Sequence, residues 1–199
     1  MNDNYIFDYI NLLERVLSYG YKNNYSLKAV ERMISYSSFF QSIEKENRSS
    51  IITDNALITQ LFDVKEVDME SIPVFNQCLW SAESYMRIQK ETSLTFEAIF
   101  IYLPLKKMYD FFPLYHEMDF LHIIEVFKNL YSKQSILSLL LNEYGFTLKD
   151  VSEKTDIPYD TLYSIKQRRR DVNKTSYETI YKLANVFKVR METISETKQ

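Results

Sequence analysis

The sequence predicts an all-α protein, and three observations support this fold class. The chain of 199 residues contains two Gly and four Pro, far fewer than the turns of a β-rich fold require. Apolar residues make up 46% of the sequence, which is enough to fill one large core or two small ones. In most segments these apolar residues recur three or four positions apart, which is the spacing of an amphipathic helix.

The first predicted helix covers residues 4–19, where apolar side chains recur at helical spacing and Gly20 is the expected end. A second helix is predicted over residues 26–45, with Ser26 as its N-cap. The polar residues 44–50 predict a loop.

Asp54 is expected to cap a short helix, and the acidic residues 63–71 are expected to be exposed. A longer helix is predicted over residues 73–90. Its inward side chains are expected to be Val74, Cys78, Leu79, Ala82, Tyr85 and Met86.

Residues 95–103 could form a strand by composition, but we favour a buried helix because Pro104 and Pro113 punctuate helical patterns on either side. Residues 114–131 predict a further helix or pair of helices. This segment leads into the C-terminal part of the chain without a Gly- or Ser-rich linker, so we expect the two parts to pack together.

The charge differs between the two predicted domains, residues 1–132 and residues 133–199. The first carries 12 Lys and Arg against 18 Asp and Glu, a net charge of −6. The second carries 12 against 9, a net charge of +3. This contrast fits a domain that meets phosphates beside an acidic domain that does not.

Two short helices separated by a tight turn are predicted near the C-terminus. Thr147, with Asp150 three residues further on, forms a capping-box pattern at the start of the first helix. Pro158 is tolerated in the first turn of a helix, so the second helix is expected to begin there. Its apolar side consists of Leu162 and Ile165.

The other side of the second helix consists of residues that can form hydrogen bonds, which are Tyr159, Asp160, Thr161, Tyr163, Ser164 and Gln167. A short helix with one apolar side and one hydrogen-bonding side suits insertion into the major groove of DNA.

Residues 148–165 resemble the helix-turn-helix of the Xre/Cro/repressor family. Residues 140–146 are similar to the first helix of this family and the Gly that ends it, residues 176–189 to its fourth helix, and residues 191–194 to its fifth. The resemblance covers about a third of the chain and implies a five-helix, lambda-repressor-like DNA-binding domain. It also implies that the third helix enters a major groove while basic loop residues hold the DNA backbone.

The sequence departs from the family pattern at four places. Ser152 stands where Ala is usual, Asp156 where the turn usually has Gly, and Leu148 where a Gln often opens the second helix. Residues 166–168 replace a Glu-x-Gly at the end of the third helix. Because Ser is small and Asp adopts left-handed conformations more readily than most residues, we expect the fold to be kept while the base-reading details differ.

The resemblance implies that the six hydrogen-bonding residues include the base-reading set, with Tyr159 and Gln167 as the strongest candidates. The arginines at 168–170 directly follow this helix, where the chain passes the DNA backbone in the geometry of the family. The expected phosphate contacts are Lys149, Lys166, Arg168, Arg169, Arg170 and Lys174.

Catalytic and metal-binding patterns are not indicated. His116 and His122 lie six residues apart, unlike the two histidines of a metalloprotease helix, and Cys78 is expected to be part of a core. We therefore expect no enzymatic activity, metal or cofactor. The acidic pairs, which are expected on solvated faces, are Glu44 with Glu46 and Asp68 with Glu70.

The chain is expected to act in the cytoplasm without inserting into a membrane. Its single cysteine cannot form an internal disulfide framework, and its polar N-terminus lacks the basic start of a secretory signal. The longest apolar runs are too short to span a bilayer.

Together these patterns predict a sequence-specific transcriptional regulator of bacterial or phage type, which binds double-stranded DNA as a homodimer and acts as a repressor. The N-terminal domain would dimerise, sense a signal or hold a partner protein. One alternative is an antitoxin or other neutralising protein, whose N-terminal domain binds a partner while the helix-turn-helix autoregulates. A second alternative, kept open by Leu148 and Asp160, is a protein-binding module that no longer reads DNA.

Overall fold

The computed structural model describes residues 3–45 and 52–196, and every regular element within these ranges is helical. The N-terminal part contains α1 (Asp3–Lys22), α2 (Leu27–Tyr36), α3 (Ser38–Glu44), α4 (Asp54–Phe62), the 3-10 helix η1 (Met69–Ser71), α5 (Asn76–Thr92), α6 (Phe96–Tyr102), α7 (Leu105–Tyr115) and α8 (Phe120–Lys133). The C-terminal part contains α9 (Ile136–Tyr144), α10 (Leu148–Thr155), α11 (Tyr159–Lys166), the 3-10 helix η2 (Val172–Lys174), α12 (Tyr177–Phe187) and α13 (Met191–Ser195). The predicted all-α fold class is confirmed. The loop predicted at residues 44–50 was wrong at Glu44, which is the last residue of α3, and residues 46–50 lie outside the described residues.

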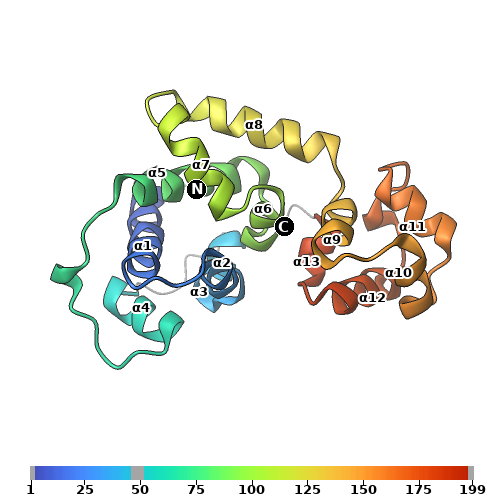
Figure 1. Cartoon of the computed structure of the whole chain (residues 1–199), viewed down its shortest axis with the longest axis horizontal. Coiled ribbons are helices and arrows are strands. Elements are labelled where there is room, and N and C mark those ends of the chain that lie inside the picture. The colour runs from blue at the N-terminus through green and yellow to red at the C-terminus, as the bar shows by residue number, and fades with distance from the viewer. Residues whose placement is uncertain (1–2, 46–51, 197–199) are drawn as a thin grey trace.

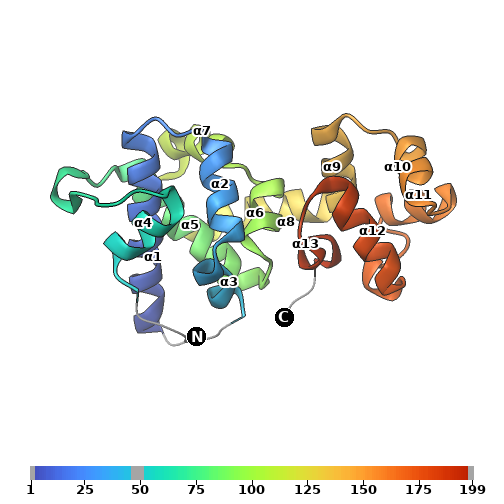
Figure 2. The same ribbon diagram turned by 90° about the horizontal axis from the view of Figure 1, so that it is seen from below.

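The two parts lie side by side along the long axis of the molecule (Figure 1). In the N-terminal part α5 packs against α1, α7 and α8, and α1 also packs against α2 and α4. The chain passes into the C-terminal part through α8, and α6 contacts both α9 and α13 where the parts meet (Figure 2). The predicted packing of the two parts against each other is therefore present, and α11 lies at the far end of the molecule from α1.

The first helix does not end at Gly20, as its sequence suggested, but continues to Lys22. A Cβ atom at Gly20 would lie 2.8 Å from the Cγ2 atom of Val30, which is closer than non-bonded carbon atoms normally approach. This glycine therefore permits the close packing of α1 against α2, and it does not terminate a helix.

The helix predicted over residues 26–45 is two helices, because Ser37 between them is extended. The break redirects the chain so that Phe40 is fully buried, with its ring 5.6 Å from that of Phe96. The predicted N-cap is confirmed, since the Ser26 hydroxyl accepts a hydrogen bond from the Ala29 N–H at 3.2 Å.

Three smaller expectations in the N-terminal part were wrong. Thr53 is the N-cap of α4, and Asp54 lies in its first turn. Val74 precedes α5, and both Val74 and Leu79 are exposed. Pro113 lies inside α7 and does not bound it.

The segment at residues 95–103 is the buried helix α6, as predicted, and the hydroxyl of Thr95 caps it by accepting from the Ala98 N–H. Cys78 is buried, as expected, with its sulfur 3.4 Å from the Tyr109 hydroxyl. Burial raises the pKa of this thiol, so the thiol is protonated and unreactive at neutral pH.

Glu44 corrects the expectation of a solvated acidic face, because it is buried where the two parts meet. Its carboxylate accepts two hydrogen bonds of 2.9 Å from the Arg190 guanidinium and one of 2.6 Å from the Phe96 N–H. Glu97 accepts from the Arg190 N–H at 2.9 Å and from the Thr193 hydroxyl at 2.6 Å. Burial disfavours the charge on Arg190, but the hydrogen bonds and the charge of Glu44, together with the charges of Glu97 and Glu192, outweigh it and raise the pKa of the guanidinium.

The remaining acidic pair, Asp68 and Glu70, is exposed as predicted, and Glu46 lies outside the described residues. His116 and His122 lie against neighbouring rings at the turn between α7 and α8. No three metal-ligating side chains gather at a common point in the described ranges, and none of the helices there combines the length and apolar character needed to cross a membrane.

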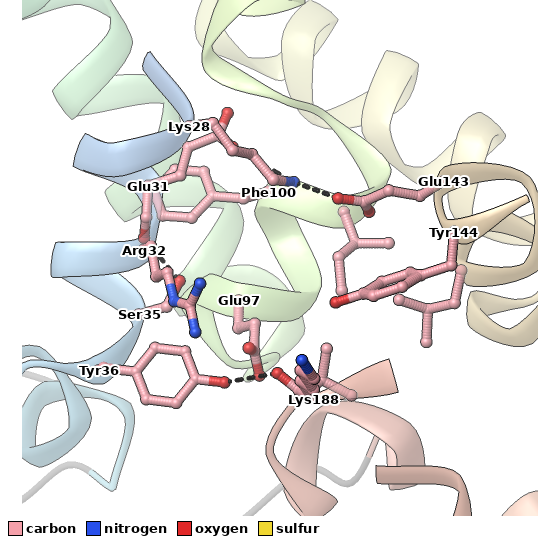
Figure 3. A pocket seen from close by; sticks show the side chains of 13 residues that line it. Lys28, Glu31, Arg32, Ser35, Tyr36, Glu97, Phe100, Glu143, Tyr144 and Lys188 are labelled. Atoms are coloured by element: carbon pink, nitrogen blue, oxygen red, sulfur yellow. Dashed lines mark hydrogen bonds and ion pairs between the residues drawn. The ribbon is translucent and has the colours of Figure 1, made fainter. Parts of the chain in front are cut away.

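We call the region where the N-terminal and C-terminal parts meet the junction. A pocket opens beside it, between α2 and α6 on one side and α9 and the end of α12 on the other (Figure 3). The Lys28 ammonium pairs with Glu143 across it at 2.6 Å, and the Tyr36 hydroxyl donates to the Lys188 carbonyl at 3.0 Å. Burial and the neighbouring Glu97 raise the pKa of Tyr36 to about 12, so its hydroxyl remains a donor at neutral pH. These two polar contacts therefore join the N-terminal part to the C-terminal part on both sides of the pocket.

Replacing Arg190 by Met leaves the carboxylates of Glu44 and Glu97 buried without a counter-ion, and we expect a loss of about 3–5 kcal/mol in the free energy of unfolding at neutral pH. The cost comes from buried charges that have lost their partner, so replacing one carboxylate by a neutral amide of the same shape should recover part of the loss.

Urea unfolding of the wild type, of Arg190→Met and of the double variant with Glu44→Gln at pH 7.5 tests this expectation. The double variant should be more stable than Arg190→Met alone. An equal or larger loss in the double variant would contradict the assignment of a buried, uncompensated charge.

Candidate nucleic-acid interface

The first helix of the predicted helix-turn-helix begins with the expected capping box. The Thr147 hydroxyl accepts from the Asp150 N–H at 3.2 Å, and the Asp150 carboxylate accepts from the Thr147 N–H at 2.7 Å. The hydrogen bonds that the Asp150 carboxylate accepts from the N–H and the hydroxyl of Thr147 hold the pKa of Asp150 below its ordinary value. Because all the partners lie within four residues, the start of α10 is determined locally.

The turn between α10 and α11 depends on the two residues that depart from the family pattern. Asp156 has a φ of 57°, so it occupies the left-handed region, and its N–H donates to the Ser152 carbonyl at 2.9 Å. The Ser152 hydroxyl donates to the Ile157 carbonyl at 2.6 Å, which ties the end of the turn back to α10. Both substitutions are therefore compatible with the tight turn.

α11 buries its apolar side and presents its hydrogen-bonding side. Leu162 and Ile165 are buried against α9 and α10, as predicted. Four of the six proposed base-reading residues are exposed and two are half-buried; the exposed ones are Tyr159, Asp160, Tyr163 and Gln167, and the half-buried ones are Thr161 and Ser164. The rings of Tyr159 and Tyr163 lie one turn apart, with centroids 6.4 Å apart and planes only 14° from parallel.

The C-terminal end of α11 is closed by backbone hydrogen bonds from the arginine run. Arg168 has a φ of 53°, and its N–H donates to the Ile165 carbonyl at 3.0 Å. The Arg169 N–H donates to the Ser164 carbonyl at 2.9 Å, which completes a Schellman motif. This position usually takes Gly, which explains why the family pattern has Gly where this chain has Arg168.

The three arginines differ in where their charges lie. All three are exposed residues, and the Arg169 guanidinium lies 5.7 Å from the centre of the Tyr163 ring. The Arg168 guanidinium instead donates to the Gln134 carbonyl at 2.8 Å and to the Tyr102 hydroxyl at 2.9 Å. It also lies 3.5 Å from the Glu196 carboxylate and 4.7 Å from the centre of the Tyr131 ring.

The remaining phosphate candidates are three lysines. Lys149 and Lys174 are exposed, and the ammonium of Lys149 lies 3.8 Å from Glu153 at the surface. Lys166 is half-buried at the end of α11. The roles of all these side chains toward DNA remain predictions. The contacts of Arg168 within the protein were not foreseen, and the one signal for them in the sequence is an arginine where the family usually has Gly.

The comparisons with known proteins agree with this geometry. Residues 137–199 match the family model described as the Cro/C1-type helix-turn-helix DNA-binding domain, and the match covers almost all of α9 and the whole of α10–α13. It leaves the N-terminal part outside. Searches of curated proteins and of solved structures found no significant match. The domain match supports a DNA-binding transcription regulator.

We expect Asp156→Gly to stabilise the protein by up to about 1 kcal/mol, because Gly adopts the left-handed conformation at this turn without steric cost. Asp156→Val should instead destabilise it, since a β-branched residue is strained at positive φ. Chemical denaturation of the wild type and the two variants gives the order of their free energies of unfolding. If both variants changed stability by the same amount, the backbone conformation of residue 156 would not be the cause.

Proposed function

We propose that this protein is a transcriptional repressor that binds a specific double-stranded DNA site through α11 and has no enzymatic role. The observation that carries this proposal is the position of α11 within the matched domain. Its hydrogen-bonding face is exposed at the end of the molecule away from the N-terminal part (Figure 1). A helix of this size fits the major groove, where each base pair presents a distinct set of donors and acceptors.

The exposed residues of α11 have the chemistry that base reading requires. The Gln167 amide can bind both N6 and N7 of an adenine, and the Asp160 carboxylate can accept from N4 of a cytosine. The Tyr159 ring can pack on a thymine methyl group while its hydroxyl donates a hydrogen bond. We propose these three as the main readers, with Thr161, Tyr163 and Ser164 beside them.

Phosphate contacts would orient the domain on the duplex. We propose that Arg169 and Arg170 make the contacts at the end of α11, because both are exposed and follow the reading face. The lysines of the phosphate set, Lys149, Lys166 and Lys174, would add to them. The net charge of +3 on residues 133–199, against −6 on residues 1–132, would favour approach of DNA to this end.

A matched pair of variants separates reading from phosphate contact. Gln167→Ala should weaken binding to the specific site by about 1–3 kcal/mol and leave non-specific binding almost unchanged. The double variant with Arg169→Ala and Arg170→Ala should weaken binding to all sequences alike and reduce the slope of log K against log salt by about 2.

Gel-shift and fluorescence-anisotropy titrations against the DNA upstream of the gene, with a scrambled duplex as control, provide the measurement. If the wild type bound no duplex, the proposed function would be lost. If Gln167→Ala weakened both duplexes equally, Gln167 would not be a reader.

We also propose that the N-terminal part forms a homodimer, so that two α11 helices read half-sites about one helical turn, roughly 34 Å, apart. One such domain covers little DNA surface, and a second copy doubles the readout. Leu114, Met118 and Leu121 are exposed around the turn between α7 and α8 and offer apolar surface for the second copy.

Light scattering should give twice the chain mass of 23.8 kDa for the wild type, and the chain mass itself for a double variant with Leu114→Glu and Leu121→Glu. A wild-type monomer that co-purifies with a small partner protein would favour the antitoxin alternative over the dimer.

A further inference from the structure

The end of the recognition helix is joined to the N-terminal part through one side chain. Arg168 follows α11 directly, and its guanidinium reaches the Tyr102 hydroxyl on α6 and the Gln134 carbonyl between α8 and α9. The Tyr102 hydroxyl also hydrogen-bonds to Glu196, which lies beside the same guanidinium. A residue of the DNA-binding turn is thus held by groups that lie 66 and 34 positions away in the sequence.

The backbone conformation indicates that this contact is maintained against a cost. Among the described residues, those with positive φ that are neither Gly nor a short polar residue are Arg168, Lys188 and Glu196. A left-handed conformation costs such residues about 1–2 kcal/mol each. All three lie at the junction: Arg168 and Glu196 both bond to Tyr102, and the Lys188 carbonyl accepts from Tyr36. The strained residues coincide with the contacts between the two parts.

The charge of Arg168 is already compensated within the protein. Glu196 lies 3.5 Å from its guanidinium, and the Tyr131 ring lies 4.7 Å beneath it. Moving this side chain to a phosphate would break the hydrogen bonds to Tyr102 and Gln134 and leave Glu196 without its partner. Arg169 and Arg170 are free of that constraint, yet the amides of both donate to the Ser164 carbonyl and follow any shift of the turn.

We propose that Arg168 is a positioning residue, which fastens the turn after the recognition helix to α6 so that the N-terminal part sets where Arg169 and Arg170 meet the DNA backbone. This inference rests on the proposed DNA-binding function. It replaces a direct phosphate contact of Arg168 with an indirect role. It also gives the N-terminal part a route to DNA binding, because any partner or signal that moves α6 acts on this turn.

Arg168→Gly is the informative variant, because Gly is the residue that a Schellman turn prefers. The substitution keeps the backbone turn and relieves its strain while it removes the link to α6. Tyr102→Phe removes the hydrogen bond to α6 from the other side by deleting one hydroxyl, and it leaves the hydrogen bonds of Arg168 to the Gln134 carbonyl in place. Arg170→Ala serves as the control for a true phosphate contact.

Binding of the full-length proteins to the specific duplex would be measured over a range of salt concentrations. We expect both Arg168→Gly and Tyr102→Phe to weaken binding by about 5- to 10-fold with the salt slope of the wild type, whereas Arg170→Ala should reduce the slope by about 0.9. Amide hydrogen exchange should become faster at residues 168–171 in both Arg168→Gly and Tyr102→Phe, and it should remain unchanged in Arg170→Ala.

Two results would overturn the proposal. A salt slope reduced by about 0.9 in Arg168→Gly, with wild-type binding by Tyr102→Phe, would identify Arg168 as a phosphate contact. Wild-type affinity in both variants would show that the link has no effect on binding. If Arg168→Gly unfolded, Tyr102→Phe alone would decide between these results, and failure of the wild type to bind DNA would refute the proposed function instead.

Discussion

The junction between the two parts is built around the guanidinium of Arg190, whose side chain is only 12% exposed. Arg190 stands at the start of α13 and pairs with Glu44 from the end of α3, while its N–H and Thr193 donate to Glu97 on α6. Each carboxylate also serves a helix start, because Glu44 accepts from the first N–H of α6 and Glu97 from the first turn of α13. Three helix ends therefore share one set of directional hydrogen bonds. Removing such charges from water is costly, so arrangements that leave any of them unpaired are strongly disfavoured.

This constraint joins the matched C-terminal domain to the N-terminal part through packed helices. A tethered helix-turn-helix would search for its site independently of the rest of the chain. Here α13 and α9 pack on α6, so the orientation of α11 follows that of the N-terminal part. If the N-terminal part forms the proposed dimer, the distance between the two reading helices is built into the junction, and the spacing of the half-sites follows from it.

Tyrosine gives the junction its mixed character. Tyr102 packs its ring near Phe127 and Tyr131 while its hydroxyl bonds to Glu196 and accepts from Arg168. Tyr36 similarly reaches the Lys188 carbonyl from the N-terminal part. An apolar ring with a polar end can bury surface and specify an orientation at the same time. A purely apolar junction would bury similar area, but with less control over the angle between the parts.

The sequence by itself determined whatever depends on near neighbours. Several features rest on contacts within four residues and can therefore be predicted from the sequence. They are the helix content, the capping box of Thr147 and Asp150, the cap at Ser26 and the start of α11 after Pro158. The face of α11 that is buried follows from the same short-range periodicity. These local signals are also what the match to the Cro/C1-type domain reflects.

Tertiary structure alone decided which residues depart from the roles that the local sequence pattern predicts for them. Gly20 looked like a helix end and is a point of close packing with α2. Glu44 looked solvated but is buried against Arg190, which lies 146 positions away, and the Arg168 side chain binds Tyr102, 66 positions away, a contact that the sequence did not indicate. A residue's own neighbours carry no information about such partners. Burial and pairing of a charge are properties of the space around it, and that space exists only once the distant helices have packed.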